Sequence, residues 1–436
     1  MFFVSFQADA YIGLGPLLPV VGSFLIFLFV VLIAVIGVLG YPIKRLVNAL
    51  KKNHRTDDSD QRSKNQKELN FQPRRKITRQ LNAIAASVTD NLAEVETLIL
   101  RRRLPTEINK PIFICGLARS NTTLLTHILN SHPETGSFLY RDLPFPAIPY
   151  FWSFFNSSYY RGKSIERRIH RDAIWVDPNS PDAFEEIIWK KNLSGYFDGK
   201  FCESLDQSYD NPRLESALRE SIRKILLVRG DRKLFFVRKR KARYISKGNY
   251  NLFRLKYILK FFPDSRFILC IRNPIDQSLS MARVHQEFIQ LGLADQSFGK
   301  KLNHLGHFEF GPNRKPLTIN PDGSRITEAY WAEGEDYKGY LQQWIDVYSF
   351  VLDNYLSDDN LGQHILVVDH EKFFAEIKYQ ITQILEFCRL KSTTTFLEKA
   401  LEQVSNESRY EQPTEQSDQE KRAQDIYAEI VSRGTP

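Results

Sequence analysis

The segment 111–129 constrains the fold of this chain more than any other part of its sequence. An apolar run, 111–115, leads into a short loop that starts at Gly116. The next residues carry apolar side chains at helical spacing, namely Leu124, Leu125, Ile128 and Leu129. A strand that turns through a tight loop into a helix aims backbone N–H groups and the helix dipole at one point, which is how proteins cradle a phosphate. The segment therefore predicts an α/β fold with an anion site at this turn.

The loop differs from the phosphate loop of ATP- and GTP-using proteins at one decisive position. Gly116 matches the first glycine of that motif and Thr123 matches its final hydroxyl, but Thr122 stands where the lysine would be. That lysine contacts the β and γ phosphates. Ser120 adds a further hydroxyl donor and Arg119 a forked positive charge. We therefore expect a site for a 5′-phosphate that is poorly suited to phosphoryl transfer from ATP.

A second motif lies at 261–274, where a Phe-Phe-Pro-Asp turn precedes an apolar strand that stops sharply. Pro274 is suited to open the next helix, with Asn273 as its N-cap. Arg272 at the strand end and Ser280 on the following helix can then converge on one phosphate.

Together these motifs resemble the sulfotransferase superfamily, in particular its bacterial-type carbohydrate and tyrosyl-protein-like branch. The family's phosphosulfate loop commonly reads Pro, Arg or Lys, Ser, Gly, Thr, Thr. This chain has Ala118 in place of the proline and Asn121 in place of the glycine. Asparagine tolerates the left-handed backbone conformation, so Asn121 can keep the turn.

The resemblance implies a P-loop-kinase-like three-layer α/β fold with a central parallel sheet. It also implies 3′-phosphoadenosine-5′-phosphosulfate (PAPS) as the co-substrate and no metal. Arg272 and Ser280 would hold the 3′-phosphate. The 5′-phosphosulfate would be held by Gly116, Arg119, Ser120, Asn121, Thr122 and Thr123.

Catalysis by in-line displacement needs cations on the oxygens that gain charge and a base beside the acceptor hydroxyl. By position in the family, Lys247 would stabilise the transferring group together with Arg119. Asp142 is the first candidate for the base and His170 the second. Asp142 could instead pair with Arg141 or cap a helix.

Several other segments carry weaker expectations. His304, His307 and Glu309 lie at a spacing not typical of a metal site, so we interpret them as an acceptor-side loop. Residues 340–352 predict an amphipathic helix, and 365–368 predict a further central strand, followed by Asp369 and His370 as loop or cap residues. The buried positions of that helix would be Trp344, Val347, Tyr348 and Val351. The four cysteines are expected to be free thiols: Cys115, Cys202, Cys270 and Cys388.

The N-terminal part predicts a membrane anchor. The run 17–39 has no charged residue and is long enough to cross a bilayer as a helix, which we place at 17–41 after a short N-terminus, 1–16. A cleaved signal peptide is disfavoured because no basic region precedes the run. The positive residues follow it, at Lys44, Arg45, Lys51, Lys52 and Arg55, whereas only Asp9 precedes it. The positive-inside rule therefore predicts a single-pass protein whose catalytic domain faces the cytoplasm.

A basic polar linker is expected at 42–76, either contacting anionic lipid headgroups or simply solvated. The domain follows at 77–410, and 411–436 predicts a polar tail with a short helix. The first helix of the domain, 77–100, should pack on the rest of the domain through one apolar face: Ile77, Leu81, Ile84, Val88, Leu92, Val95 and Ile99.

The leading hypothesis is sulfuryl transfer to a hydroxyl of a carbohydrate, glycolipid or other acceptor such as a peptide. The net charge of +9 suits an anionic partner without identifying it. A nucleotide or small-molecule kinase is the alternative enzyme, and a catalytically inactive membrane scaffold is the alternative outside enzymes. A nucleic-acid partner is not expected, because the sequence shows no aromatic-basic recognition motif.

Overall fold

The computed structural model describes residues 91–143, 145–159, 166–167, 175–193, 202–233, 236–239, 243–294, 308–404 and 416–434. The chain divides into two compact units at Gln72 and Pro73, and every described residue belongs to the second. The expected membrane helix and linker lie outside the described residues, as do His170, His304 and His307. Within the described part of the chain, no helix is long and apolar enough to cross a membrane.

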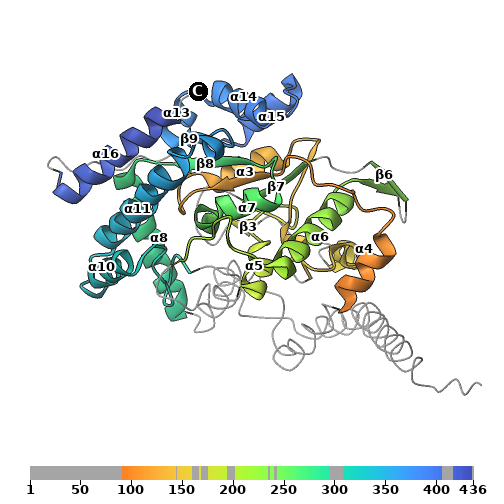
Figure 1. Ribbon diagram of the computed structural model, residues 1–436, viewed down its shortest axis with the longest axis horizontal. Coiled ribbons are helices and arrows are strands. Elements are labelled where there is room, and N and C mark those ends of the chain that lie inside the picture. Colours follow the sequence, from red (N-terminus) through yellow and green to blue (C-terminus); the bar gives the residue numbers. More distant parts are fainter. Residues whose placement is uncertain are drawn as a thin grey trace, which may run out of the picture. The chain divides into compact units, whose positions relative to one another are not determined.

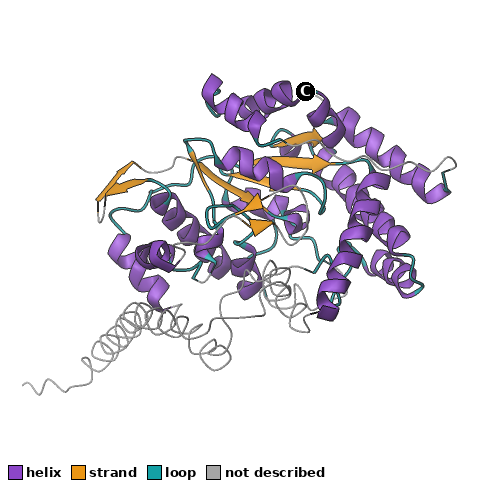
Figure 2. Cartoon of the chain, turned by 180° about the vertical axis from the view of Figure 1, so that it is seen from behind, coloured by secondary structure: helices purple, strands orange, loops and turns teal. Residues whose placement is uncertain are grey.

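A five-stranded parallel sheet forms the centre of the domain (Figures 1 and 2), as the sequence predicts. The strand order is β2 (Thr135–Gly136), β7 (Arg243–Lys247), β1 (Ile112–Cys115), β8 (Arg266–Ile271) and β9 (Ile365–Asp369). Strand β1 is buried along its whole length because β7 and β8 flank it and helices cover both faces. Such strands are apolar on both sides, which explains the continuous apolar run at 111–115.

Two apolar clusters cover the two faces of this sheet and make the domain three layers thick. Alternate residues of the strands point to opposite faces, so Phe113 and Phe267 belong to one cluster and Ile114 and Ile268 to the other. The first face is covered by α5 (Glu186–Asn192), α6 (Pro212–Val228), α7 (Leu255–Phe261) and α11 (Asp336–Val351). The second is covered by α3 (Thr122–Asn130), α13 (His370–Ala375), α14 (Ile377–Phe387) and α15 (Thr394–Glu402).

The remaining described elements connect these layers or extend them. Three longer helices are α4 (Pro149–Tyr159), α8 (Pro274–Ala294) and α10 (Pro321–Ala332). The short helical segments are η2 (Tyr140–Asp142), η3 (Asn249–Phe253), η4 (Leu352–Leu356) and α12 (Asp359–Gly362). Two antiparallel strand pairs are β3 (Glu166–Arg167) with β4 (Trp175–Val176), and β5 (Asp231–Lys233) with β6 (Phe236–Lys239).

The C-terminal part of the domain confirms two predictions and corrects one. The predicted helix at 340–352 is α11, whose expected apolar positions are fully buried. Asp369 caps α13 by accepting the N–H of Lys372, as expected. Strand β9, however, lies at the edge of the described sheet and not in its centre. The expected tail contains α16 (Asp418–Arg433), which buries Ala423 and Ile430 against the domain.

The helix at 91–100 corrects a further prediction. Val95 and Ile99 were expected on its buried face but are 38% and 60% exposed. The residues that face the domain are instead Glu96 and Leu100, which are 0% and 1% exposed. The reason is an ion pair between Glu96 and Lys224 of α6, which fixes the rotation of the helix about its axis. All four cysteines are free, as predicted, and all four are buried.

Candidate functional site

The loop between β1 and α3 begins with a glycine that no other residue could replace without strain. The φ angle of Gly116 is +154°, a conformation that residues with a side chain rarely adopt. A Cβ atom there would lie 2.5 Å from the carbonyl oxygen of Cys270 and 2.6 Å from Oγ of Ser120. The loop therefore approaches the end of β8 closely.

Two further residues of the loop have left-handed backbone conformations. Asn121 has a φ of 74° and is the N-cap residue of α3, which confirms that asparagine keeps this turn. Arg119 has a φ of 71°, which is uncommon for a residue with a long side chain. Its carbonyl oxygen accepts a hydrogen bond from Nη1 of Arg272 at 3.3 Å, and its Nε donates to Oγ of Ser280 at 3.0 Å. The structure thus places Arg119 of the loop in contact with both Arg272 and Ser280 of the second motif.

Side chains of α8 and α11 hold the loop through a set of hydrogen bonds. The sequence analysis did not predict these bonds. Nε2 of Gln277, in the first turn of α8, donates to the carbonyl oxygens of Leu117 and Ala118 at 3.2 and 2.8 Å. Nε1 of Trp344 in turn donates to Oε1 of Gln277 at 2.9 Å. The hydroxyl of Tyr348 accepts the N–H of Leu117 at 3.2 Å. These bonds hold the loop through contacts within the protein, which is the preorganisation that an anion site requires.

The start of α3 is suited to receive an anion. No side chain caps it, and its first turn contains no acidic residue. Ser120, Thr122 and Thr123 bring buried hydroxyl groups to the same turn. The N–H groups of this turn and the positive end of the helix dipole therefore face a site that also carries hydroxyl groups.

The β8 motif has the predicted local structure. Pro274 opens α8, and Oδ1 of Asn273 accepts the N–H of Ile275 at 3.0 Å. Arg272 and Ser280 are 4% and 1% exposed, so both side chains lie in the interior beside the loop. Their assignment to a 3′-phosphate stays a prediction.

Lys247, the last residue of β7, is a third cation at the carboxyl ends of the strands. With Arg119 and Arg272 it forms what we call the row of cations. Its register partner on β1 is Ile114, so it lies beside the strand that leads into the loop. Its Nζ donates to Oδ1 of Asp182 at 2.9 Å, and the hydroxyl of Tyr140 donates to Oδ2 at 3.1 Å. Both members of the ion pair are nearly excluded from water. The parallel strands β7, β1 and β8 thus end in Lys247, the Arg119 loop and Arg272, at the carboxyl edge where α/β sheets bind ligands.

Asp182 belongs to a buried acidic segment that sequence reasoning also missed. Glu185 accepts a hydrogen bond from the hydroxyl of Tyr244 at 2.5 Å, and Glu186 pairs with Arg254 at 2.6 Å. Burial raises the pKa of the Glu185 carboxyl, while Tyr244 and Arg254 act to lower it. The available signal was three carboxylates at i, i+3 and i+4 within an otherwise apolar stretch, where acids are seldom buried without partners.

Asp142, the first candidate for the base, is held by structural contacts. Its carboxylate accepts the N–H of Leu139 at 2.8 Å and forms an ion pair with Arg229, directly after α6. Nε of Arg229 also donates to the carbonyl oxygen of Ser137 at 3.0 Å. Asp142 is 0% exposed. These contacts favour the structural alternative, with Arg229 and not Arg141 as the partner, and the role of Asp142 as base stays a prediction.

Of the three polar residues His304, His307 and Glu309, Glu309 is the one that lies among the described residues. It is 4% exposed, and its Oε1 accepts a hydrogen bond from Nδ2 of Asn249 at 2.9 Å. Asn249 follows Lys247 by two residues, so Glu309 lies near the end of β7. No group of three histidine, cysteine or acidic side chains that could hold a metal ion occurs among the residues the structure describes.

Residues 111–304 contain the loop, Lys247 at the end of β7 and the β8 motif. Residues 111–304 match the model of the Sulfotransferase family. No curated protein matches the chain.

Solved structures of bacterial sulfotransferases are distantly similar to this domain. One from Mycobacterium avium is 12% identical, with a TM-score of 0.45, over 78% of this chain and 80% of that one. One from Mycobacterium tuberculosis is also 12% identical, with a TM-score of 0.42, over 72% and 76% of the two chains. A third, from Alicyclobacillus acidocaldarius, has 12% identity and a TM-score of 0.35, over 75% and 95%.

Proposed function

We propose that this protein is a sulfotransferase that moves a sulfuryl group from PAPS to an acceptor hydroxyl. The observation that carries the proposal is the row formed by Lys247, Arg119 and Arg272 at the carboxyl ends of three adjacent strands. Thr122 in place of the P-loop lysine argues against transfer from ATP. The match of residues 111–304 to the Sulfotransferase family supports the same activity.

Different residues would hold the two ends of the nucleotide. The uncapped start of α3 with its hydroxyl groups suits the 5′-phosphosulfate, since backbone N–H groups and a helix dipole bind anions. Arg272 and Ser280 suit the 3′-phosphate. Arg119 contacts Ser280, so its guanidinium would lie between the two anionic groups. A planar guanidinium can donate to oxygens of both.

In the transfer step the acceptor oxygen attacks sulfur, the bond from sulfur to the bridging oxygen of the 5′-phosphate breaks, and 3′-phosphoadenosine-5′-phosphate (PAP) leaves. Charge grows on the bridging oxygen and on the sulfuryl oxygens. Lys247 and Arg119 are the cations placed to stabilise it. The proton of the acceptor passes to a base.

For the base we propose Asp182 ahead of Asp142. Asp182 lies against Lys247, whereas Asp142 is held by Arg229 at the end of α6. While Lys247 is bound to Asp182, its ammonium occupies Oδ1 of the carboxylate. When Lys247 turns to the developing charge, that oxygen becomes available to accept the proton of the acceptor hydroxyl.

Asp182→Asn, with the exposed Asp206→Asn as its control, separates this role from a structural one. We expect the Asp182 change to reduce kcat by at least about 100-fold and to remove the acidic limb of the pH profile, while PAP affinity is retained. An unchanged pH profile, or equal losses in the two variants, would refute the assignment.

We also propose that 17–41 anchors the protein in a membrane with its catalytic domain on the cytoplasmic side. The support is the charge-free run and the basic residues that follow it. The acceptor would then be a hydroxyl presented at the membrane, such as that of a glycolipid or lipid-linked sugar. A C-terminal tag that is digested by protease added outside intact cells or to a lumen would contradict this orientation.

The activity itself is tested with the full chain in detergent, sulfur-35-labelled PAPS and an acceptor panel of sugars, lipid-linked sugars and tyrosine peptides. Label should reach one acceptor class. Lys247→Met should abolish transfer, while Lys256→Met, on α7 and paired with Asp358, should not. Transfer of phosphate from ATP to any acceptor, or loss of activity in neither variant, would overturn the proposal.

A further inference from the structure

The helix at 91–100 buries a charged residue and exposes apolar ones, which is the reverse of an ordinary surface helix. Glu96 is 0% exposed and faces the domain. Val95, Leu98 and Ile99, at i, i+3 and i+4, face outward and are 38%, 71% and 60% exposed. Surface helices normally bury such an apolar stripe and expose their charges. We call these three residues the outer stripe.

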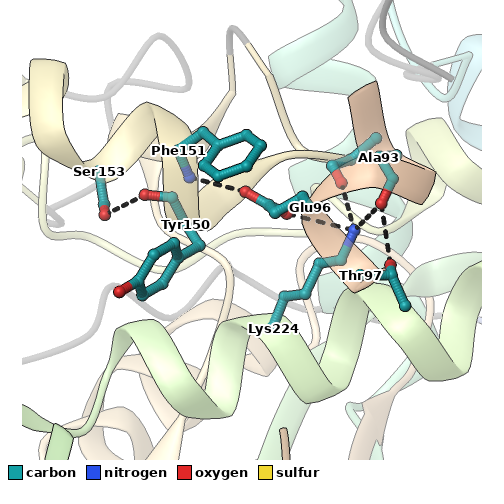
Figure 3. A network of polar contacts seen from close by, with 8 residues as sticks. Ala93, Glu96, Thr97, Tyr150, Phe151, Ser153 and Lys224 are labelled. Atoms are coloured by element: carbon teal, nitrogen blue, oxygen red, sulfur yellow. Dashed lines mark hydrogen bonds and ion pairs between the residues drawn. The ribbon is translucent and has the colours of Figure 1, made fainter. Parts of the chain in front are cut away.

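The contacts of Glu96 fix this orientation (Figure 3). Its Oε1 accepts the N–H of Phe151 at 2.6 Å, and its Oε2 lies 3.2 Å from Nζ of Lys224. Nζ of Lys224 also donates to the carbonyl oxygen of Ala93 at 2.8 Å. It donates to the carbonyl oxygen of Ala147 as well, at 3.2 Å. If the helix rotated to bury the outer stripe, it would break this network and leave a buried lysine without its carboxylate. The outer stripe is therefore held outward.

Basic residues border the outer stripe. Arg101, Arg102 and Arg103 follow the helix directly and are exposed. Leu100 and Leu104, on either side of these arginines, pack with Leu227 and Val228 at the end of α6.

The chain next to this contact is basic as well. Strand β5 begins three residues after Val228. Strands β5 and β6 contain Arg232, Lys233, Arg238 and Lys239. Figure 1 shows β6 and α4 at the same end of the domain as the orange helix 91–100.

We propose that this face docks on the surface of an anionic phospholipid bilayer. The outer stripe enters the boundary between headgroups and acyl chains, and Arg101 to Arg103 pair with lipid phosphates. An apolar stripe beside clustered arginines is the composition of helices that lie in a membrane interface. A nucleic acid would match the arginines but would give the stripe no apolar partner. A second protein copy is the remaining alternative, and the dependence of the signal on protein concentration tests it.

The docking face goes beyond the proposed catalytic activity and does not depend on it. Three apolar side chains make a weak contact, so the face orients the domain at the membrane and does not anchor it. The ion pair between Glu96 and Lys224 connects this face to α4 and α6, which pack within the catalytic domain.

The test uses the full chain added to lipid vesicles, with an environment-sensitive fluorophore on Leu98→Cys. The four native cysteines are buried, so the new thiol is the reactive one among the described residues. Leu401→Cys on α15, also exposed, is the matched control. In vesicles containing phosphatidylglycerol, emission from position 98 should shift to the blue and be quenched by lipid-borne quenchers, while emission from position 401 should not.

Replacing Arg101, Arg102 and Arg103 by glutamine should lower the ratio of lipid-inserted to aqueous probe at position 98 by about 100-fold, because each basic residue near an anionic surface contributes about fivefold. An aqueous signal from position 98 in anionic vesicles would overturn the proposal. So would an equal shift in pure phosphatidylcholine. A shift in detergent alone that grows with protein concentration would assign the face to a second copy and would also overturn it.

Discussion

The buried ion pair of Glu96 and Lys224 gives a sharp prediction about stability. The two side chains are 0% and 2% exposed, and Lys224 supplies the charge that compensates the carboxylate. Lys224→Met keeps most of the side-chain volume but removes this charge and the donor to Ala93 and Ala147. Breaking a buried pair in this way costs about 3–5 kcal/mol, because one charge is left buried without compensation.

The loss should depend on pH in a defined direction. Burial raises the pKa of Glu96, and Lys224 is the main influence that lowers it. Without Lys224 the pKa of Glu96 rises further, so the folded variant binds a proton at a pH where the unfolded chain does not. The free-energy difference between variant and wild type should therefore be largest near pH 8 and shrink as the pH falls toward the unfolded value of 4.5.

Urea denaturation of the full chain in detergent, followed by tryptophan fluorescence at pH 8 and pH 5, measures this difference. Lys421→Met is the matched control, because Lys421 and its partner Asp418 are exposed. It should change stability little at either pH. Glu96→Gln combined with Lys224→Met should recover part of the loss, since neither charge remains. Equal effects of the two single lysine changes, or a loss independent of pH, would refute the reasoning.

Three further changes have defined outcomes. Gly116→Ala should lower PAP affinity and should lower stability to urea by about 1–3 kcal/mol, because its Cβ would lie 2.5 Å from the carbonyl oxygen of Cys270. Unaltered PAP and urea titrations would show that the loop tolerates a side chain. Asn121→Gly should leave PAP affinity and stability near wild type, whereas Asn121→Val should lose about 1–2 kcal/mol of stability, and equal values for the two would refute the left-handed requirement. Burial lowers the pKa of His285 to about 4, so stability should fall as pH falls from 6.5 toward 4, and His285→Gln, which can still accept the N–H of Gly311, should flatten this dependence in urea titrations.

Local features of the fold could be predicted from the sequence because each depends on neighbours in the chain. The apolar run at 111–115 indicates a strand buried on both faces. The left-handed turn at Asn121 and the cap formed by Asn273 follow from the properties of asparagine. The order of the strands does not follow from such patterns, which is why β9 was expected in the centre and lies at the edge.

Contacts between distant residues explain what the sequence could not predict. Asp182 meets Lys247 across 65 positions of the chain, so no local motif connects them. The apolar spacing of the helix at 91–100 predicts a stripe but does not say which side the domain occupies. Glu96 decides that, because its partner Lys224 comes from another helix. The loop motif and the β8 motif could be recognised, since each is contiguous. The hydrogen bonds that hold the loop through Gln277 and Trp344 could not.

The central claim is that the row of cations binds the bisphosphate nucleotide that sulfuryl transfer leaves behind. The most direct measurement is a calorimetric titration of the full chain with PAP, beside ATP. Two arginines from opposite ends of one strand make a matched pair: Arg272, beside the loop, and Arg266, whose Nη1 contacts the carbonyl oxygen of Gln363. PAP should bind the wild type and Arg266→Ala tightly and Arg272→Ala about 10- to 100-fold more weakly, since charge-assisted hydrogen bonds to a phosphate are lost. Equal affinity in the two variants, or a preference for ATP, would contradict the account.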